Sequence, residues 1–562
     1  MEDLNVIIAG AAGQGVETIG DLLIQTAAAQ GYAVFSWKEY ESRIRGGQNS
    51  YSIRISEAPR NAPVMEADVL LALNEGAIEK YGPLLKKEGT LLAEKKAKDR
   101  KMIAIPFAEI AQKVAGKKIY ANTVALGALA AVLGIEQQRL NAVLSRVFAV
   151  KGKDIIQSNH LAAEKGYLKA VADCADMCSW KLPKRPGKHY LLTVNEAISL
   201  ASVYAGCRFI AAYPMSPSTG IITFLAKHQE EFGVFAEQAE DEIAAINMAI
   251  GAGYAGVRAM TATSGGGFAL MVEGVSLAGM TETPLVIVLA QRPGPATGLQ
   301  TRTAQGDLLF AVNAGHGEFP KMVFAPSDPL DAFIKTVRAF NLADQYQIPV
   351  ILMTDQFLSD AHFSMEEFDF GRIEPQFHMA DSSHIKDYKR YALTEDGISP
   401  RLYPGCSSHL VGADSDEHDE KGHMTEDLPG MAVPMAKKRL AKMKCLKAEI
   451  SMPEEVFLEE PDIIFVGWGS SRQGIVEAIR LLNKDGVNAG MIHFTELWPL
   501  PEYAFPSGKS YWTVENNSTG QLARLLRSEY GMDFKGTLSR YDGLPLTGDF
   551  IRRQFNAQNK SL

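Results

Sequence analysis

Four loops in the middle of the chain combine hydroxyls, carboxylates, glycines and an arginine in a pattern that suits a binding or catalytic site. Each loop follows a short apolar segment that we expect to be a strand, over residues 208–212, 234–236, 257–261 and 285–290. The loops read YPMSPST (213–219), EQAEDE (237–242), ATSGGG (262–267) and QRPGP (291–295). Because ligands gather at the carboxyl ends of strands in parallel α/β sheets, these loops are predicted to meet at one crevice.

The side chains in these loops offer three kinds of chemistry: a hydroxyl on Ser216, a carboxylate on Glu240 and a guanidinium on Arg292. Glu240 lies at the carboxyl end of an expected strand, where the next helix opens. Each residue also has an ordinary interpretation, Glu240 as a charge at a helix N-terminus and Ser216 as a turn or cap residue. Their occurrence at successive strand ends favours a site over coincidence.

A second candidate site is the loop GAAGQG near the start of the chain, between an expected strand (5–9) and an expected helix (16–30). Exposed N–H groups and the helix dipole at such a position favour phosphate, and downstream arginines would suit a phosphate-rich ligand such as coenzyme A. The candidate binding residues are Gly10, Gly13, Gln14, Gly15, Arg43 and Arg45. The glycine order departs from G-x-G-x-x-G, which disfavours an NAD-linked dehydrogenase. The other interpretation is a tight structural turn with solvated charges.

Apolar strands that alternate with helical patterns predict an α/β protein with parallel, helix-covered sheets. A linker rich in Pro and Lys covers residues 181–189, and a stretch rich in Pro, His and charge precedes a third βαβ block with strands at 463–466, 489–493 and 511–514. A helix is expected at 433–447. The predicted domains are residues 1–180, 190–370 and 456–562, with an extended linker or insertion at 371–455.

Composition excludes several classes of protein. The chain has 562 residues, 46% apolar and 22% charged, and a net charge of −9, so it is globular and a poor match for nucleic acid. Residues 209–226 are too interrupted by Pro and Gly to span a membrane, and the N-terminal residues Met-Glu-Asp-Leu lack the basic region and apolar core expected of a signal peptide. Five Cys without a C-x-x-C pair predict a reduced, cytoplasmic chain, with Cys174 and Cys178 as packed thiols.

The longer motifs resemble one family. YPMSPST, AEDEIAAINMAIGAGYAG, MTATSGGGFALM and RPGPATGLQTRTAQGDL resemble the α subunit of 2-oxoacid:ferredoxin oxidoreductases. The first block, with GAAGQG and SRIRGGQNSYSIRIS, resembles their γ subunit, and GWGSS, LWPLPEY and TVENNSTGQL resemble their transketolase C-terminal-like domain. The resemblance implies a Rossmann-like γ domain fused to a thiamine pyrimidine-binding domain and that third domain. Ser216 stands where the family usually has Thr, which puts the positioning of that hydroxyl in doubt.

The family resemblance implies thiamine diphosphate as cofactor, with Glu240 facing its aminopyrimidine and with Tyr213 and Thr263 in the same half-site. The sequence contains no Gly-Asp-Gly diphosphate motif and no motif for an iron–sulfur cluster. The diphosphate, Mg²⁺ and a 4Fe–4S cluster are therefore expected in a β-type partner subunit, within an (αβ)₂ heterotetramer that passes electrons to ferredoxin. No metal is expected in this chain.

Substrate binding is assigned, by resemblance, to Arg302 in the TRT motif and to Arg292 and Ser216, because an arginine binds a carboxylate through two parallel hydrogen bonds. Either arginine could instead be a structural bridge. The implied reaction converts a 2-oxoacid and coenzyme A to acyl-CoA and CO₂. The fusion of γ to α favours 2-oxoglutarate; the alternatives are pyruvate or branched or aryl oxoacids, and a non-catalytic subunit that only binds coenzyme A.

The segment at 414–427 is acidic and contains two histidines. It lacks the glycine and the closing glutamate of an EF-hand, and its histidines do not follow a zinc spacing. We expect a surface or interface loop.

Overall fold

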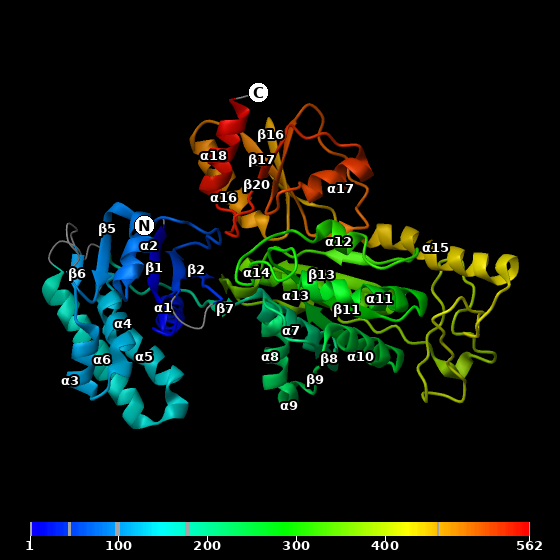
Figure 1. The fold of residues 1–562 in the computed structure, drawn as a ribbon, viewed down its shortest axis with the longest axis horizontal. Helices are drawn as coiled ribbons and strands as arrows, with labels where there is room; N and C mark the ends of the chain where they lie inside the picture. The colour runs from blue at the N-terminus through cyan, green and yellow to red at the C-terminus, as the bar shows by residue number, and fades with distance from the viewer. Residues whose placement is uncertain (1–2, 43–46, 96–101, 175–179, 458–459, 561–562) are drawn as a thin grey trace. The chain divides into compact units, whose positions relative to one another are not determined.

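The computed structural model describes residues 3–42, 47–95, 102–174, 180–457 and 460–560, and has the expected α/β class (Figure 1). The chain forms two compact units. The first comprises Met1–Leu192 with Ala361–Phe368, and the second comprises Thr193–Asp360 with Asp369–Leu562. No helix in the described ranges is long and apolar enough to cross a membrane.

The first unit is built on an eight-stranded sheet of order β6-β5-β4-β1-β3-β2-β14-β7. Its strands are β1 (Asp3–Ala11), β2 (Ala33–Glu39), β3 (Gln48–Ser56), β4 (Ala67–Ala72), β5 (Leu85–Ala93), β6 (Met102–Ala104), β7 (Tyr190–Leu192) and β14 (His362–Met365). β1 pairs in parallel with β4 and antiparallel with β3. The apolar run that predicts a buried strand at 5–9 therefore forms the centre of this sheet.

The described residues of the first unit also form six α-helices. They are α1 (Val16–Ala29), α2 (Glu75–Tyr81), α3 (Phe107–Ala115), α4 (Ala121–Val132), α5 (Gln137–Val147) and α6 (Lys153–Asp173). Helices α4 and α6 pack so closely that a Cβ at Gly127 would lie 2.0 Å from the carbonyl oxygen of Ala163. Because α6 ends at Asp173, Cys174 does not lie within a helix; it is disulfide-bonded, so the prediction of a packed thiol there is wrong. Cys178 lies outside the described residues.

Strand β14 comes from a part of the sequence that we expected to belong to the second block. It lies between β2 and β7 and pairs antiparallel with both. Its His362 ring nitrogen Nδ1 is 3.1 Å from the hydroxyl of buried Tyr51. A four-residue strand carries too little periodicity to reveal its sheet, which explains why the sequence does not predict this pairing.

The second unit contains a seven-stranded sheet of order β18-β12-β13-β11-β10-β8-β9, parallel except at β18. Its strands are β8 (Phe209–Ala212), β9 (Phe235–Gln238), β10 (Ala259–Thr263), β11 (Leu285–Gln291), β12 (Met322–Phe324), β13 (Pro349–Asp355) and β18 (Glu496–Trp498). The four strands predicted before the polar loops are confirmed, each within two residues of its expected ends.

Helices cover this second sheet. They are α7 (Val194–Tyr204), α8 (Thr219–Lys227), α9 (Gln229–Phe232), α10 (Glu242–Tyr254), α11 (Gly265–Met280), α12 (Leu308–Val312), α13 (Pro329–Tyr346) and α14 (Gln356–Asp360). Helix α10 packs against α11, while α7 packs against α13 and α8. The Thr193–Glu196 capping box starts α7, and the Asp241 carboxylate caps α10 by accepting from the Ala244 N–H at 2.7 Å.

A five-stranded sheet of order β15-β17-β16-β19-β20 forms the C-terminal part of the same unit. Its elements are β15 (Glu454–Val456), β16 (Ile463–Trp468), α16 (Ser471–Lys484), β17 (Ala489–Phe494), β19 (Ser510–Glu515), α17 (Gln521–Tyr530), β20 (Gly536–Ser539) and α18 (Gly548–Asn559). The predicted strands and the βαβ pattern are confirmed. Trp468 and Leu522 share one apolar core with Leu308 and Ile287, so the two sheets of this unit are packed together.

The predicted helix near residue 433 is α15 (Val433–Glu449), and buried charges attach it to the rest of the unit. Lys438 and Lys442 donate to the two carboxylate oxygens of Glu282 at 2.6 and 2.5 Å. Burial by itself raises the pKa of Glu282, but the two lysines have the larger effect and lower this pKa to about 2. Removing Glu282 would leave both buried lysines without their counter-charge.

Candidate functional site

The polar loops of the second unit lie at one edge of its sheet. Strands β9, β8, β10 and β11 are neighbours and run in parallel, so their carboxyl ends share that edge. The loops that carry Ser216, Glu240 and Arg292 start there, and Thr263 is the last residue of β10 at the same edge. The sheet thus has the topology that the sequence predicts for a ligand crevice.

The loop after β8 is held in place by hydrogen bonds to its backbone. The Arg292 guanidinium donates to the Ser216 carbonyl oxygen at 2.8 Å, and Asn195 donates to the Pro217 carbonyl oxygen at 3.0 Å. The Ser216–Pro217 peptide bond is cis. The side chain of Ser216 is exposed, and Tyr213 is 40% exposed, so both remain available to a ligand.

Arg292 is a buried cation with unused hydrogen-bond donors. It is 9% exposed, and burial lowers its pKa from the usual value. Within the described part of the chain its one hydrogen bond goes to the Ser216 carbonyl oxygen, and no carboxylate forms an ion pair with it. Since a guanidinium carries five N–H donors in a planar fork, Arg292 can still bind a carboxylate through two of them.

The acidic loop after β9 contains one exposed and one buried glutamate. Glu240 lies in the loop and is exposed, whereas Glu242 is the first residue of α10 and is 4% exposed. The Oε1 atom of Glu242 is buried and makes no hydrogen bond to any described residue. An unpartnered buried carboxylate oxygen is costly, so a ligand that donates a hydrogen bond there would satisfy it.

Glycine creates the space that Glu242 occupies. A Cβ on Gly267 would lie 2.4 Å from Glu242 Oε1 and 2.2 Å from Thr263 Oγ1. Thr263 is fully buried at the end of β10, so its hydroxyl and the Glu242 carboxylate meet beside the first turn of α11. The sequence expectation names Thr263 but not Glu242.

A second buried carboxylate lies at the same helix N-terminus. A Cβ on Gly265 would lie 2.5 Å from Asp307 Oδ2, a buried oxygen that makes no hydrogen bond within the part of the chain that the structure describes. Burial raises the pKa of Asp307 to about 6. The hydroxyl of Ser264, the residue before α11, is also buried and unpartnered. This set of unsatisfied acceptors fits a ring that carries N–H donors, such as the aminopyrimidine of thiamine diphosphate.

Arg302 belongs to a segment with no helix or strand of its own. Its Cβ lies 2.9 Å from the position of a Cβ on Gly543, and the N–H of Thr303 donates to the Gly543 carbonyl oxygen at 3.2 Å. Arg302 is half-buried. The C-terminal part of the unit therefore contacts this arginine directly, whereas Arg292 is held by the loop after β8.

The glycine loop of the first unit follows β1 and opens α1, as predicted. Gly13 and Gly15 have φ angles of +85° and +78°. A Cβ on Gly15 would lie 1.9 Å from the Asn122 side chain, so packing requires that glycine, whereas none of the described residues lies within 4 Å of a Cβ on Gly13. The space at Gly13 fits a phosphate-bearing ligand near the start of α1.

Gln14 shapes this loop from inside. Its Oε1 atom accepts hydrogen bonds from the Ala11 N–H at 2.6 Å and from Asn74 at 2.5 Å. That oxygen also lies 3.0 Å from the position of a Cβ on Gly10. The structure therefore gives Gln14 a structural contact that the sequence does not predict. Arg43 and Arg45 lie outside the described residues.

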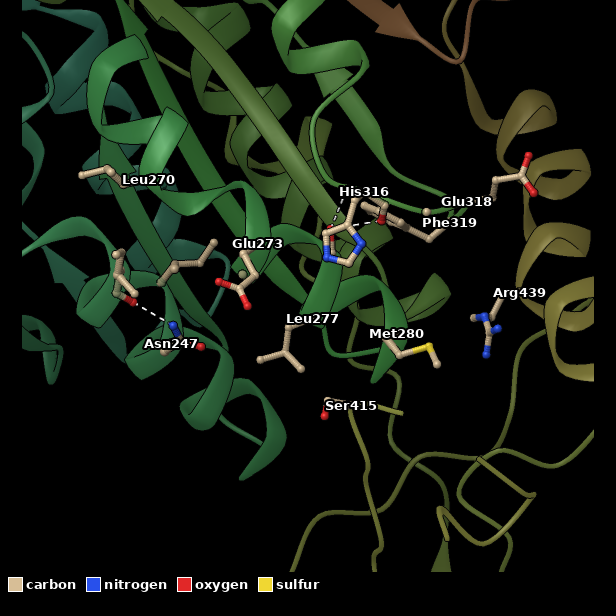
Figure 2. A pocket seen from close by; sticks show the side chains of 15 residues that line it. Asn247, Leu270, Glu273, Leu277, Met280, His316, Glu318, Phe319, Ser415 and Arg439 are labelled. Carbon is tan, nitrogen blue, oxygen red and sulfur yellow. Dashed lines mark hydrogen bonds between the residues drawn. The ribbon is translucent and has the colours of Figure 1, made fainter. Parts of the chain in front are cut away.

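A cavity of about 550 Å³ lies along helices α10 and α11 (Figure 2). Ile243, Leu270 and Leu277 give it an apolar wall, and Glu273, His316 and Glu318 add polar groups. Arg439 lines it from α15 but is already paired with Glu417 at 2.7 Å. Glu242 is not among the lining residues, so the cavity and the buried carboxylates are separate features.

Comparisons with known proteins agree with this geometry. Residues 200–437 match the family model "Pyruvate flavodoxin/ferredoxin oxidoreductase, thiamine diP-bdg", and residues 5–169 match "Pyruvate ferredoxin/flavodoxin oxidoreductase". The 2-oxoacid:ferredoxin oxidoreductase subunit alpha of Saccharolobus solfataricus is 31% identical over 98% of this chain and 97% of its own length. The 2-oxoglutarate synthase subunit KorA of Methanothermobacter thermautotrophicus is 36% identical over 56% of this chain and 83% of its own length.

A solved structure extends the likeness to the whole fold. The 2-oxoglutarate:ferredoxin oxidoreductase from Magnetococcus marinus, with 2-oxoglutarate, coenzyme A and succinyl-CoA bound, superposes with a TM-score of 0.91 at 31% identity. The match covers 99% of this chain and 100% of that one. On this sequence identity and coverage, the chain belongs to the family of 2-oxoacid:ferredoxin oxidoreductase α subunits.

Proposed function

We propose that this chain is the α subunit, with a fused γ domain, of a 2-oxoglutarate:ferredoxin oxidoreductase. The reaction converts 2-oxoglutarate and coenzyme A to succinyl-CoA and CO₂, and passes two electrons to ferredoxin. The observation that carries the proposal is the full-length likeness to an enzyme with 2-oxoglutarate, coenzyme A and succinyl-CoA bound. The 36% identity to a 2-oxoglutarate synthase subunit supports the same substrate.

Thiamine diphosphate supplies, when bound, a stabilised carbanion for decarboxylation. Glu242 is the residue we assign to its aminopyrimidine, in preference to Glu240, because Glu242 is buried and its Oε1 atom has no partner. Its carboxylate would hold and return a proton at Oε1. Thr263 and Tyr213 would orient the same ring, since Thr263 lies beside Glu242 and the exposed Tyr213 follows the neighbouring strand β8.

Two arginines suit a substrate with two carboxylates. Arg292 keeps free N–H donors behind the Ser216 loop, and Arg302 lies in the segment packed against Gly543. Each can bind one carboxylate in a bidentate way, with the exposed Ser216 hydroxyl as a further donor. A mono-carboxylate such as pyruvate would leave one arginine without its anion. The second arginine therefore favours 2-oxoglutarate over pyruvate and over branched or aryl oxoacids, in agreement with the likeness to the relatives.

Coenzyme A is assigned to the first unit. Gly13 has open space around it and precedes the N-terminus of α1, where a phosphate gains from the helix dipole. Arg43 and Arg45 would add cations near the same loop.

The β-type partner is assigned to the outer surface of α10 and α11. Apart from a few polar residues such as Asn247 and Glu273, both helices are apolar on every face, and Ile243, Met248 and Leu270 are 49%, 42% and 51% exposed. A helix that is apolar on every face is usually covered on every face. The α10 and α11 N-termini also carry the buried carboxylates, so a chain bound here would be close enough to complete the cofactor site. That chain would hold the diphosphate, Mg²⁺ and a 4Fe–4S cluster in an (αβ)₂ assembly.

The test is copurification of the tagged chain from its native host, followed by activity measurements on the complex with thiamine diphosphate and Mg²⁺. We expect a second chain that carries iron, and oxoacid oxidation that requires coenzyme A. The chain expressed alone should contain no iron and should not oxidise oxoacids. Stoichiometric iron in the purified single chain would refute this division between subunits.

A further inference from the structure

The segment that carries Arg302 owes its shape to the C-terminal part of the second unit. Residues 303–307 form neither helix nor strand, so no regular backbone ladder fixes them. Ordering such a segment costs conformational entropy, which contacts from outside must offset. Those contacts come from loops at the carboxyl ends of β16 and β19 and from Gly543.

Gln305 is the centre of these contacts. Its backbone N–H donates to the Asn516 carbonyl oxygen at 2.7 Å, and its carbonyl oxygen accepts from the Asn517 side chain at 3.1 Å. Its side chain donates to the Trp468 carbonyl oxygen at 2.8 Å and accepts from the Asn516 N–H at 3.0 Å. Gln305 is only 1% exposed, and all four of its polar groups are therefore bound at the carboxyl ends of β16 and β19 in the five-stranded C-terminal sheet.

The same loops also hold the far end of the segment. Gln521, the first residue of α17, donates to the Gly306 carbonyl oxygen at 2.6 Å and accepts from the Leu309 N–H at 3.0 Å. At the near end, Thr303 bonds to Gly543, and the Arg302 side-chain stem packs against the same glycine. Arg302 thus projects from a strip whose two ends and centre are fixed by the C-terminal sheet.

We propose that Gln305 is a positioning residue through which the C-terminal sheet sets the placement of Arg302. The inference rests on the proposed function, because it takes Arg302 to bind a substrate carboxylate. It gives the C-terminal sheet a role in substrate binding although none of its own side chains needs to touch the substrate. A bidentate arginine contact is sensitive to placement, since a displacement of about 1 Å can cost about a hundredfold in rate.

The test compares Gln305→Leu with wild type in the complex with its partner, measuring KM and kcat for the oxoacid and for coenzyme A. Leucine keeps the bulk and the backbone bonds but removes both side-chain bonds. We expect kcat/KM for the oxoacid to fall about ten- to hundredfold, mainly through KM, with the KM for coenzyme A within about twofold. Gln305→Glu, which keeps the acceptor for Asn516 but sets a buried carboxylate oxygen against the Trp468 carbonyl oxygen, should lower kcat/KM for the oxoacid at least as much as Gln305→Leu.

A matched control separates positioning from loss of stability. Gln473 is also a buried glutamine of the C-terminal sheet region, 7% exposed, and its side-chain nitrogen has no partner. Gln473→Leu should leave oxoacid kinetics unchanged. The double variant Arg302→Ala/Gln305→Leu should differ less than about twofold from Arg302→Ala, because residues that act as one unit are not additive.

The outcomes divide cleanly. Normal oxoacid kinetics in Gln305→Leu and Gln305→Glu, or a full Gln305 effect that persists without the Arg302 side chain, would overturn the positioning role while leaving Arg302 as a substrate residue. Normal kinetics in Arg302→Ala alone would instead remove Arg302 from the proposed function, and the positioning role with it.

Discussion

Replacing Glu242 by glutamine is the most informative single change in the proposed cofactor half-site. The substitution keeps the size of a side chain that is confined between Thr263 and Gly267, so it needs no repacking. It removes the ability to hold and return a proton at Oε1. A positioned acid–base group contributes about 10²–10⁴ in rate, so we expect kcat to fall by that factor, or about 2.7–5.4 kcal/mol in activation free energy.

The stability of the Glu242→Gln variant, by contrast, should not fall. The wild-type carboxylate is 4% exposed and its Oε1 atom has no hydrogen-bond partner in the described structure, which is costly for a charged oxygen. A neutral amide lessens that cost, so the thermal midpoint of Glu242→Gln should equal or exceed the wild-type value. The loss of rate therefore cannot be attributed to unfolding.

The assay is turnover of the assembled complex together with exchange of the cofactor's acidic C–H proton in deuterated buffer. Both rates should fall in parallel in Glu242→Gln. Glu240→Gln and Glu237→Gln are the matched controls: Glu240 is exposed, Glu237 is half-buried, and both precede α10, so both should retain at least half of the wild-type rate. A large loss in Glu240→Gln with normal exchange in Glu242→Gln would return the role to Glu240, and equal mild effects in all three would mean that neither residue is the catalytic carboxylate.

Three further predictions concern other parts of the chain. Arg292→Ala should lower kcat/KM for the oxoacid by the value of one charge-assisted hydrogen bond, about 1.5–3 kcal/mol. Arg292→Lys should recover only part of this loss, because an ammonium lacks the planar fork of donors. Full activity in the alanine variant would leave Arg292 only as a support for the Ser216 loop. Gly13→Ala should raise the KM for coenzyme A more than the KM for the oxoacid. The control Gly116→Ala, at an equally open left-handed position with a φ of +67°, should change neither KM. Equal effects of the two substitutions would point to backbone strain alone. Asp307→Asn should raise the thermal midpoint at pH 7–8 but not at pH 4. Burial raises the folded-state pKa of Asp307 from 3.8 to about 6, so the wild-type protein loses free energy of unfolding as the pH rises through about 6, and the neutral amide does not. A difference in thermal midpoint that does not depend on pH would contradict this prediction.

Much of the fold was predictable because apolar strands and helical spacing are local signals. The four strands before the polar loops and the helix α15 lie where the sequence places them, to within about two residues. Strand β14 was not predictable, since four residues without periodicity gain their strand from β2 and β7, which lie far away in the chain.

The choice between Glu240 and Glu242 shows what a sequence pattern can and cannot decide. The buried residues of α10 are Glu242, Ala245, Ile246, Ala249, Ile250 and Gly253, so Glu242 lies on the apolar stripe of the helix. That spacing is visible in the sequence and could have placed Glu242 among the buried residues of the helix. The orphaned Oε1 atom, by contrast, depends on Thr263 and Gly267 of another strand and helix, which only the folded structure brings together.

The contacts of Arg292 and Gln305 lie beyond any local pattern. Arg292 binds a carbonyl oxygen 76 residues earlier, and Gln305 binds Asn516 and Asn517, more than 200 residues later. Chemistry predicts which residue types suit a carboxylate, but backbone partners carry no signature in side-chain identity. Arg43 and Arg45 stay predictions, because they lie outside the described residues.

The most direct test of the proposed activity is the rate of viologen reduction by the purified complex with 2-oxoglutarate, pyruvate, and branched and aryl oxoacids, each with and without coenzyme A. We predict coenzyme A-dependent reduction with a kcat/KM for 2-oxoglutarate at least about tenfold above every other oxoacid, since a pocket with a second arginine discriminates against a substrate that lacks the second carboxylate. Equal or higher kcat/KM for pyruvate, or reduction that does not depend on coenzyme A, would contradict the account.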